Sequence, residues 1–240
     1  LRILGLRAGM RVLDAGCGTG VVSRKMAGMV YPAEVHGVDI DEVFIEEAER
    51  LAREEGVENV KFEVGDVNDL DYPDGSFDVT YCRLVLMHVE DPVETVRELR
   101  RVTKKRGVLA VDDNDDGTVI VYPPVPRFTD LWSKYIEWSM KNGTNRCLGR
   151  ELFYILSQAG LRPVDIHLFP MSATQQNPQL LSMYISVPFG HLTPKIPTLI
   201  KGGITTREEC DEMMKEVESA RKHPGAFVMG TGFLAVGRVP

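Results

Sequence analysis

The chain is poor in cysteine, with only four among 240 residues. Successive cysteines lie more than sixty residues apart, and no Cys-x-x-Cys pair occurs. This spacing excludes the common zinc-ligand patterns and gives no indication of a disulfide framework. Because such cysteine usage fits a reducing compartment, we expect the protein to be cytoplasmic.

The sequence also lacks a long apolar run and an excess of positive charge. No stretch has the length and composition of a membrane span or the pattern of a signal peptide. The formal net charge is −7 at pH 7, whereas most nucleic-acid-binding domains carry a basic surface. We therefore expect no membrane span and no nucleic-acid partner. Hydrophobic content of 43% with 26% charged residues indicates a packed core.

Charged residues are absent altogether between Ile166 and Pro194. Pro170, Pro178 and Pro188 interrupt this segment, so it is not a membrane helix. Three interpretations stay open, namely a buried strand and helix, one wall of a pocket for an apolar substrate, or a subunit interface. The oligomeric state does not follow from the sequence.

What the chain does contain is a glycine-rich segment from Val12 to Gly20, with the sequence Val-Leu-Asp-Ala-Gly-Cys-Gly-Thr-Gly. An apolar pair leads into Asp14, and a helical pattern opens at Val21. This order predicts a strand, a tight turn and a helix, with a ligand lying close to the turn backbone. The glycine spacing differs from the dinucleotide fingerprint, and the aspartate would repel a pyrophosphate. A ligand with a positive amino group and no phosphate, such as S-adenosylmethionine, suits the loop better.

Two further carboxylates follow predicted strands. Asp39 ends an alternating segment that starts at Ala33, and it stands 19 residues past Gly20. A carboxylate at this place can accept hydrogen bonds from both hydroxyls of a ribose. Asp66 comes just after a short predicted strand over 61–64. A fourth strand is predicted over 76–82.

Together these segments resemble the seven-stranded class I S-adenosylmethionine-dependent methyltransferases, and within that class the ubiquinone/menaquinone-biosynthesis type. The resemblance is strong over residues 1–112 and weaker over 149–164 and at the last strand. It implies an α/β three-layer sandwich around a mostly parallel seven-stranded sheet with an antiparallel last strand. Helical insertions are expected after strands 5 and 6. S-adenosylmethionine would be the methyl donor, with S-adenosylhomocysteine as the product.

The resemblance also implies how the chain is divided. A helix predicted over 129–141 carries both tryptophans, Trp132 and Trp138, and is our candidate for a lid. The expected divisions are 1–240 for one methyltransferase domain, 1–112 for its cofactor-binding half, 113–148 for a lid and substrate insertion, and 177–224 for a second helical insertion.

Roles for individual residues follow from the same resemblance. Asp14 would orient the loop and attract the ligand's ammonium group, and Asp39 would bind the ribose. Ile40 would pack on the adenine face. Asp66 would accept from the adenine amine while the Val67 amide donates to the ring, although Gly-Asp pairs also form ordinary turns. The full expected cofactor set is Asp14, Ala15, Gly16, Cys17, Gly18, Gly20, Asp39, Ile40, Gly65, Asp66, Val67, Cys82 and Arg83. Within it, the backbone at Cys82 should meet the ligand, with the thiol a small packing group.

No catalytic residue is identified by the sequence. His88, His167 and His191 are the candidates for a general base, since imidazole titrates near neutrality. For His88 a structural hydrogen-bonding role is favoured, and His36 is expected in the core. Because correct alignment alone contributes roughly 7–11 kcal/mol, methyl transfer does not require a dedicated base.

Acidic residues follow the predicted fifth strand, in the run Asp112 to Asp116. The run resembles the metal site of the catechol O-methyltransferases, which also need an aspartate at the end of the fourth strand. Here Arg83 stands at that place, and because a cation repels Mg²⁺ we expect no metal. The run can also be interpreted as a turn at Asp115-Asp116-Gly117, as solvated acids, or as a group that selects a cationic substrate.

The predicted function is transfer of a methyl group from S-adenosylmethionine to a small molecule, with the uncharged segment favouring an apolar one. A protein or RNA methyltransferase is a second hypothesis. The Asn-Pro-Pro-Tyr type of motif that marks amino-methylating enzymes is absent, and Cys82-Arg83-Leu84-Val85 stands in its place. A third hypothesis is a cofactor-binding protein that has lost catalysis, and a fourth is a nicotinamide dehydrogenase.

Overall fold

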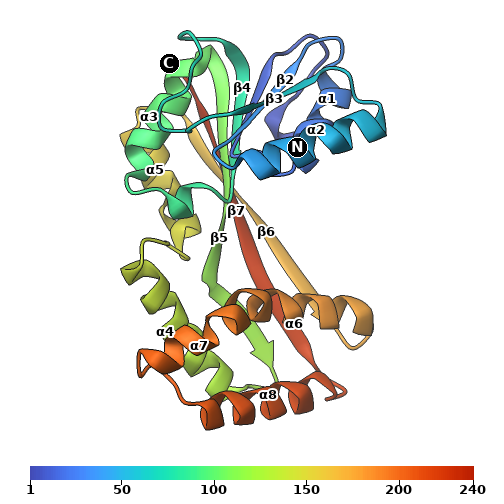
Figure 1. The fold of residues 1–240 in the computed structure, drawn as a ribbon, viewed down its shortest axis with the longest axis vertical. Coiled ribbons are helices and arrows are strands. Elements are labelled where there is room, and N and C mark those ends of the chain that lie inside the picture. Colours follow the sequence, from blue (N-terminus) through green and yellow to red (C-terminus); the bar gives the residue numbers. More distant parts are fainter. The chain divides into compact units, whose positions relative to one another are not determined.

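The computed structural model describes all residues from 1 to 240, which form two compact units (Figure 1). Unit 1 comprises Leu1–Asp113, Leu148–His167 and Phe233–Pro240, and unit 2 comprises Asn114–Cys147 and Leu168–Gly232. None of the helices is both long enough and apolar enough to span a membrane.

The helices and strands alternate through most of unit 1. Its elements are η1 (Arg2–Leu4), β1 (Val12–Ala15), α1 (Val21–Val30), β2 (Val35–Asp39), α2 (Glu42–Glu55), β3 (Val60–Val64), β4 (Phe77–Arg83), η2 (Leu86–His88), α3 (Pro92–Val102), η3 (Leu148–Glu151) and α5 (Leu152–Gln158). Unit 2 holds α4 (Pro126–Lys141), α6 (Pro178–Leu192), η4 (Thr193–Lys195), α7 (Ile196–Lys201) and α8 (Arg207–Arg221). Three long strands have residues in both units, namely β5 (Thr103–Tyr122), β6 (Val164–Thr174) and β7 (Phe227–Arg238).

The seven strands form one sheet in the order β3-β2-β1-β4-β5-β7-β6. The first five strands of this order pair in parallel. Strand β7 runs antiparallel to β5, because the Arg106 amide donates to the Val239 carbonyl while the Val239 amide donates to the Gly107 carbonyl. The predicted α/β sheet, mostly parallel with an antiparallel last strand, is therefore confirmed.

Helices cover both faces of the sheet in unit 1. Leu13 of β1 enters a core built with Val96 of α3 and Leu156 of α5. Its neighbour Val12 points to the opposite face and enters a core built with Met26 of α1. Successive residues of a strand point to opposite faces, so this division defines the three predicted layers. Helix α2 lies beside α1 and packs on β3 (Figure 1).

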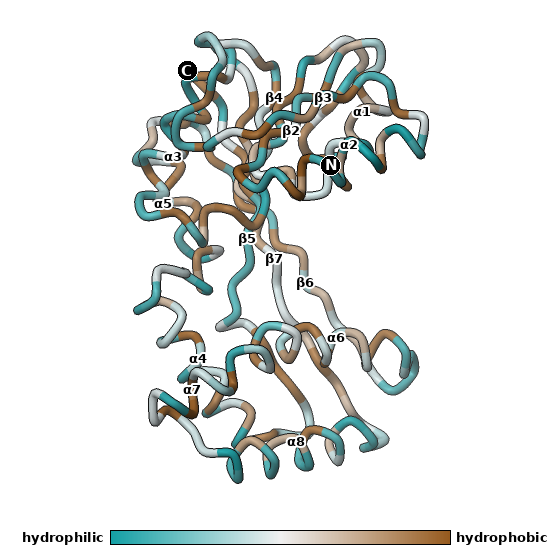
Figure 2. The backbone as a smooth tube through the Cα atoms, viewed as in Figure 1, coloured by the Kyte–Doolittle hydropathy of each residue, from teal (hydrophilic) through white to brown (hydrophobic).

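Unit 2 has its own hydrophobic core. Phe128 and Trp132 of α4 pack there with Leu199 of α7 and Met213 of α8. Hydrophilic and hydrophobic residues alternate along α8 (Figure 2), as expected for a helix with one buried face. A capping box begins α8, since the Thr206 side chain accepts from the Glu209 amide and the Glu209 side chain accepts from the Thr206 amide.

Several predicted boundaries are wrong. The run Asp112 to Asp116 was expected to follow the fifth strand, but β5 continues to Tyr122, so the predicted turn at Asp115–Gly117 is part of a strand. Long-range pairing with β7 outweighs the local turn preference of aspartate and glycine. The lid helix expected over 129–141 begins three residues earlier, at a proline that suits the first helical turn.

The uncharged segment 166–194 is not simply a buried strand and helix. Strand β6 lies at the edge of the sheet. Its apolar side chains are exposed, with Leu168 56% exposed, Phe169 43% and Met171 45%. Of the three interpretations, a pocket wall and a subunit interface remain for this strand.

Candidate cofactor site

The carboxyl ends of four parallel strands meet at one edge of the unit 1 sheet. Ala15, the last residue of β1, lies opposite Val38 of β2 and Cys82 of β4. Asp39, the last residue of β2, lies opposite Val64 at the end of β3. The predicted cofactor residues end or follow these strands, so the fold brings them to the same edge. In open α/β sheets ligands bind at this edge.

Three glycines with positive φ shape the loop between β1 and α1. The φ angles of Gly16, Gly18 and Gly20 are 74°, 51° and 70°. A Cβ atom at Gly16 would lie 2.1 Å from Val85 Cγ2, and one at Gly20 would lie 2.5 Å from Phe62. A Cβ atom at Gly18 would meet nothing within 4 Å. Two of the glycines are therefore required by the packing of the chain itself, and Gly18 is the one that offers open space to a ligand.

Asp39 holds this loop from the neighbouring strand. Its Oδ2 accepts from the Gly18 amide at 2.8 Å, and its Oδ1 accepts from the Asp41 amide at 3.1 Å. Carboxylate oxygens have about four lone-pair sites between them, so both oxygens keep capacity for ribose hydroxyls. The next residue, Ile40, is 73% exposed. An apolar side chain left in water beside this acid fits the predicted platform for adenine.

Asp14 is buried, being only 2% exposed. Its Oδ2 accepts from the Ser23 hydroxyl at 2.5 Å, which ties β1 to the first turn of α1. Burial raises the pKa of Asp14 to about 6, although the Ser23 hydrogen bond opposes the rise. The Asp14 carboxyl thus orients the loop through its bond to α1. Its attraction for the ammonium group of the ligand stays a prediction. The role of Ser23 was not predicted from the sequence. The one indication was the presence of a hydroxyl residue early in the predicted helix.

The buried carboxyl of Asp14 makes a testable prediction about pH. Its folded-state pKa of about 6 lies above the ordinary value of 3.8, so the folded protein binds this proton more tightly than the unfolded chain. Its contribution to stability therefore falls as pH rises from about 4 to about 6. Asp14→Asn should raise the free energy of unfolding at pH 7 on the order of 1–2 kcal/mol. The expected gain is smaller than the free energy that corresponds to the whole pKa difference, because the asparagine side-chain amide must also be desolvated when the protein folds.

Urea unfolding of both proteins from pH 4 to pH 8 measures this effect. The advantage of the variant should fall by about 2 kcal/mol between pH 7 and pH 4. At pH 4 Asp14 is protonated in the folded protein and close to half protonated in the unfolded chain. A difference that does not change with pH would contradict the assignment. The same variant should bind S-adenosylmethionine more weakly, because it lacks the negative charge behind the loop.

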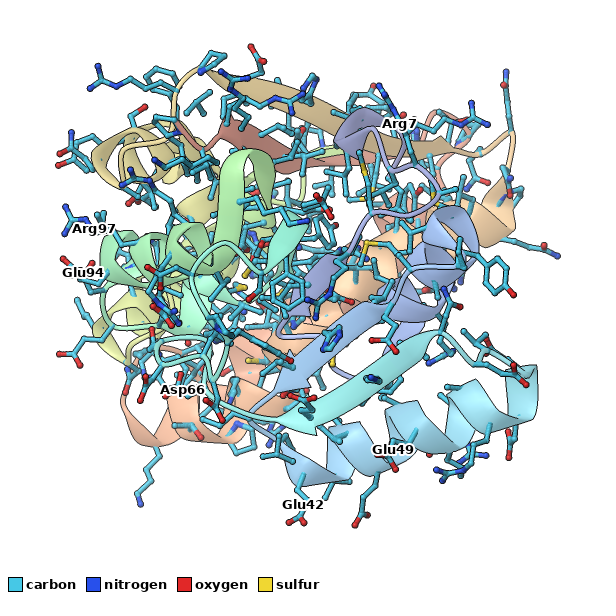
Figure 3. The ribbon with its side chains drawn as sticks, turned by 90° about the horizontal axis from the view of Figure 1, so that it is seen from above. Arg7, Glu42, Glu49, Asp66, Glu94 and Arg97 are labelled. Atoms are coloured by element: carbon cyan, nitrogen blue, oxygen red, sulfur yellow. The ribbon has the colours of Figure 1, made fainter.

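The segment after β3 forms a turn. Asp66 is exposed there (Figure 3), and its Oδ1 accepts from the Asn68 amide at 2.9 Å and from Asn68 Nδ2 at 2.8 Å. The Gly65 amide donates to the Asp39 carbonyl at 2.9 Å, while Val67 is buried. The turn interpretation therefore applies to Asp66. Acceptance by Asp66 of a hydrogen bond from the adenine amine stays a prediction. A carboxylate in a turn can also accept such a bond.

The end of β4 combines a buried thiol with a charged pair. Cys82 is fully buried, and burial raises its pKa well above the usual value, as suits a packing residue. Arg83 Nε lies 3.6 Å from Asp112 Oδ2, to which the Tyr81 hydroxyl also donates at 2.9 Å. Leu84, which follows, has φ of 57°, a strained value for this residue type. Sequence reasoning did not predict this strain at the strand end.

The acidic run after Val111 is divided between the two units. Asp112 and Asp113 belong to unit 1, and Asn114 to Asp116 belong to unit 2. Asp113 is fully buried and Asp115 is 2% exposed, so the interpretation of solvated acids is wrong for both. No group of three or more histidine, cysteine, aspartate or glutamate residues is arranged to hold a metal ion.

The three histidines considered as general bases are also divided between the two units. His88, at the end of η2, and His167, on β6, lie in unit 1, whereas His191, on α6, lies in unit 2. Their role as bases stays a prediction. His36 is buried at 6% exposure, with the Tyr72 hydroxyl 3.3 Å from its Nδ1, as expected for a core residue.

Comparison with known proteins identifies the family. The sequence profile described as methyltransferase domain matches residues 6–160. An uncharacterized methyltransferase of Schizosaccharomyces pombe is 32% identical over 148 residues, which cover 59% of this chain and 53% of that protein. A demethylmenaquinone methyltransferase of Geobacillus kaustophilus is 29% identical over 179 residues, covering 69% of this chain and 76% of that enzyme.

A third relative is known both as a sequence and as a crystal structure. The uncharacterized methyltransferase YcgJ of Bacillus subtilis is 41% identical over 108 residues, 45% of this chain and 42% of that protein. Its structure superposes with a TM-score of 0.63 at 23% identity, covering 100% of this chain and 96% of that one. The chain thus matches about half the length of the S. pombe and B. subtilis relatives in sequence, and shares its fold with the latter. Because the profile spans more than half of the residues, the chain belongs to the methyltransferase-domain family.

Proposed function

We propose that this protein transfers the methyl group of S-adenosylmethionine to an apolar small molecule. The observation that carries the proposal is the bond between Asp39 and the Gly18 amide, at 2.8 Å, in a loop that is open at Gly18. It places an acceptor carboxylate beside accessible backbone, the combination that an amino-acid nucleoside requires. Membership of the methyltransferase-domain family supports both the reaction and the donor.

The residues of unit 1 fit this cofactor. When bound, S-adenosylmethionine supplies an activated sulfonium methyl group, so the protein contributes binding, alignment and exclusion of water. Asp39 would hold the ribose, the open backbone at Gly18 would lie along the methionine portion, and Ile40 would cover the adenine. Asp14 would place negative charge behind the loop. None of these roles requires a residue of the protein to accept or donate a proton.

The nature of the acceptor is inferred from two observations. The segment 166–194 has no charged residue, and its β6 portion exposes apolar side chains. One relative is named for methylation of demethylmenaquinone, an apolar quinone. We therefore favour an acceptor of the quinone type handled by ubiquinone/menaquinone-biosynthesis enzymes. From the cysteine usage we also propose that the protein is cytoplasmic.

The division of the chain is proposed along with the function. Residues 1–112 would form the cofactor-binding half of one methyltransferase domain. The insertions at 113–148 and 177–224 would recognise the acceptor, with α4 contributing to a lid. The four aromatic and aliphatic side chains of α4 buried in unit 2 show that this helix is also structural there, so point variants test the proposal better than deletion.

Transfer of labelled methyl groups tests the proposed function. Purified protein is incubated with methyl-labelled S-adenosylmethionine and, in turn, with 1,4-dihydroxynaphthalene, transfer RNA and a mixture of unfolded proteins. We expect label in the naphthalene compound alone. Label in the RNA or the proteins would contradict a small-molecule acceptor. Binding of S-adenosylhomocysteine without any transfer would favour a protein that has lost catalysis.

A further inference from the structure

Unit 2 contains a hollow that is separate from the predicted cofactor residues, all of which lie in unit 1. Its volume is about 110 Å³, comparable with the roughly 150 Å³ of an engineered apolar cavity that binds benzene. Four elements line it, namely β5, β6, α6 and β7. Its apolar wall includes Val119, Met171, Tyr184, Val187, Pro188 and Val228.

One part of this lining is polar. Asn114, Asp115 and Asp116 of β5 contribute it, together with Thr231 of β7. Asp115 Oδ1 accepts from the Gly117 amide at 3.0 Å, and Asp116 Oδ2 accepts from Arg146 Nε at 2.5 Å. Oxygen acceptors dominate this part, so it is complementary to a group that donates a hydrogen bond. A carboxylate is a poorer match, because an ionised carboxylate has no proton to donate to these acceptors.

The apolar wall is left open to solvent. Met171 is 45% exposed and Val187 is 55% exposed, although both side chains are apolar and line the same hollow. Exposed apolar surface that surrounds a concave site marks a place for a ligand. Both residues lie in the segment without charges, as do Tyr184 and Pro188. A charged side chain in this wall would have to be desolvated when an apolar ligand binds.

We propose that this hollow binds a neutral aromatic molecule through a hydroxyl group, with the ring against Met171 and Val187 and the hydroxyl donating to the oxygens of the Asn114–Asp116 segment. Among the interpretations of the uncharged segment, this proposal favours the pocket wall.

Three small probes test the chemistry of the hollow. Calorimetry compares 1-naphthol, which donates a hydrogen bond, with naphthalene, which cannot, and with 1-naphthoate, which is anionic. We expect 1-naphthol to bind at least about tenfold more tightly than either, because it alone carries a hydroxyl that can donate a hydrogen bond to these oxygens. Equal or tighter binding of 1-naphthoate would overturn the proposal.

A matched pair of variants tests the location. Val187→Trp fills the hollow and should weaken 1-naphthol about tenfold or more. Met183→Trp places the same side chain on the same helix, at a position that is 53% exposed and does not line the hollow. This control should bind 1-naphthol as the unmodified protein does. Unchanged affinity in Val187→Trp, or equal losses in both variants, would overturn the location.

The affinity for S-adenosylhomocysteine separates the two proposals. It should stay unchanged in both tryptophan variants. A protein that binds S-adenosylhomocysteine but not 1-naphthol overturns the inference about the hollow and leaves the proposed function standing. A protein that binds neither overturns both.

Discussion

Replacing Gly16 by alanine is expected to lower the free energy of unfolding by about 2–5 kcal/mol. A left-handed backbone costs a residue with a Cβ atom roughly 1–2 kcal/mol, and Gly16 has φ of 74°. The new Cβ atom would also lie 2.1 Å from Val85 Cγ2. Because valine is branched at Cβ and has few rotamers, it cannot simply turn away. The overpacking adds about 1–3 kcal/mol. Urea unfolding followed by circular dichroism measures the sum.

Two other glycines provide the controls. Gly56 ends α2 with φ of 68°, and a Cβ atom there would meet nothing within 4 Å. Gly56→Ala should therefore lower the free energy of unfolding only by the roughly 1–2 kcal/mol of the left-handed backbone. Gly18→Ala should resemble it in stability, since the space around Gly18 is also open, yet it should abolish tight binding of S-adenosylmethionine. The double variant Gly16→Ala with Val85→Ala should recover part of the loss. Equal stability of Gly16→Ala and Gly56→Ala would contradict the packing argument.

Replacing Asp39 by alanine should weaken S-adenosylmethionine about 10- to 150-fold. Hydrogen bonds to a charged group contribute about 1.5–3 kcal/mol, and this carboxylate is the predicted acceptor for the ribose hydroxyls. The variant also loses the acceptor for the Gly18 amide, so the loop should become less ordered before binding. Calorimetry with S-adenosylhomocysteine gives the dissociation constant without turnover.

The aspartate two residues further on is a matched control. Asp41 caps α2, with Oδ1 accepting from the Val43 amide at 2.9 Å. Asp41→Ala should lower stability by about 0.5–2 kcal/mol and leave the cofactor affinity nearly unchanged. If Asp39→Ala keeps the affinity of the unmodified protein, the ribose role is wrong. If both variants lose affinity equally, the effect comes from loosening of this segment and not from the carboxylate at 39.

Local signals were sufficient to predict much of unit 1. Helix α3 spans Pro92–Val102, where Asp91 caps it and a proline occupies its first turn, and both residue types are local helix signals. Helix α2 ends at Gly56 in the left-handed conformation that glycine tolerates best. The strand, glycine turn and helix around Asp14 also follow the predicted order. In these segments the neighbours that determine the structure lie close in sequence.

Contacts between distant segments could not be predicted in the same way. The clash that requires Gly16 comes from Val85, and the one at Gly20 comes from Phe62. No local pattern relates these positions. The same holds for β5, whose continuation to Tyr122 depends on pairing with a strand more than a hundred residues later. The exposed face of β6 depends on its place at the edge of the sheet, which is a property of the whole fold.

The binding preference of the unmodified protein tests the central claim, that the glycine loop and Asp39 together hold a sulfonium nucleoside. Calorimetric titrations with S-adenosylhomocysteine and with NAD⁺ are run under the same conditions. We predict saturable one-to-one binding of S-adenosylhomocysteine and no measurable binding of NAD⁺. Binding of NAD⁺ with no binding of S-adenosylhomocysteine would contradict the account and favour a dehydrogenase.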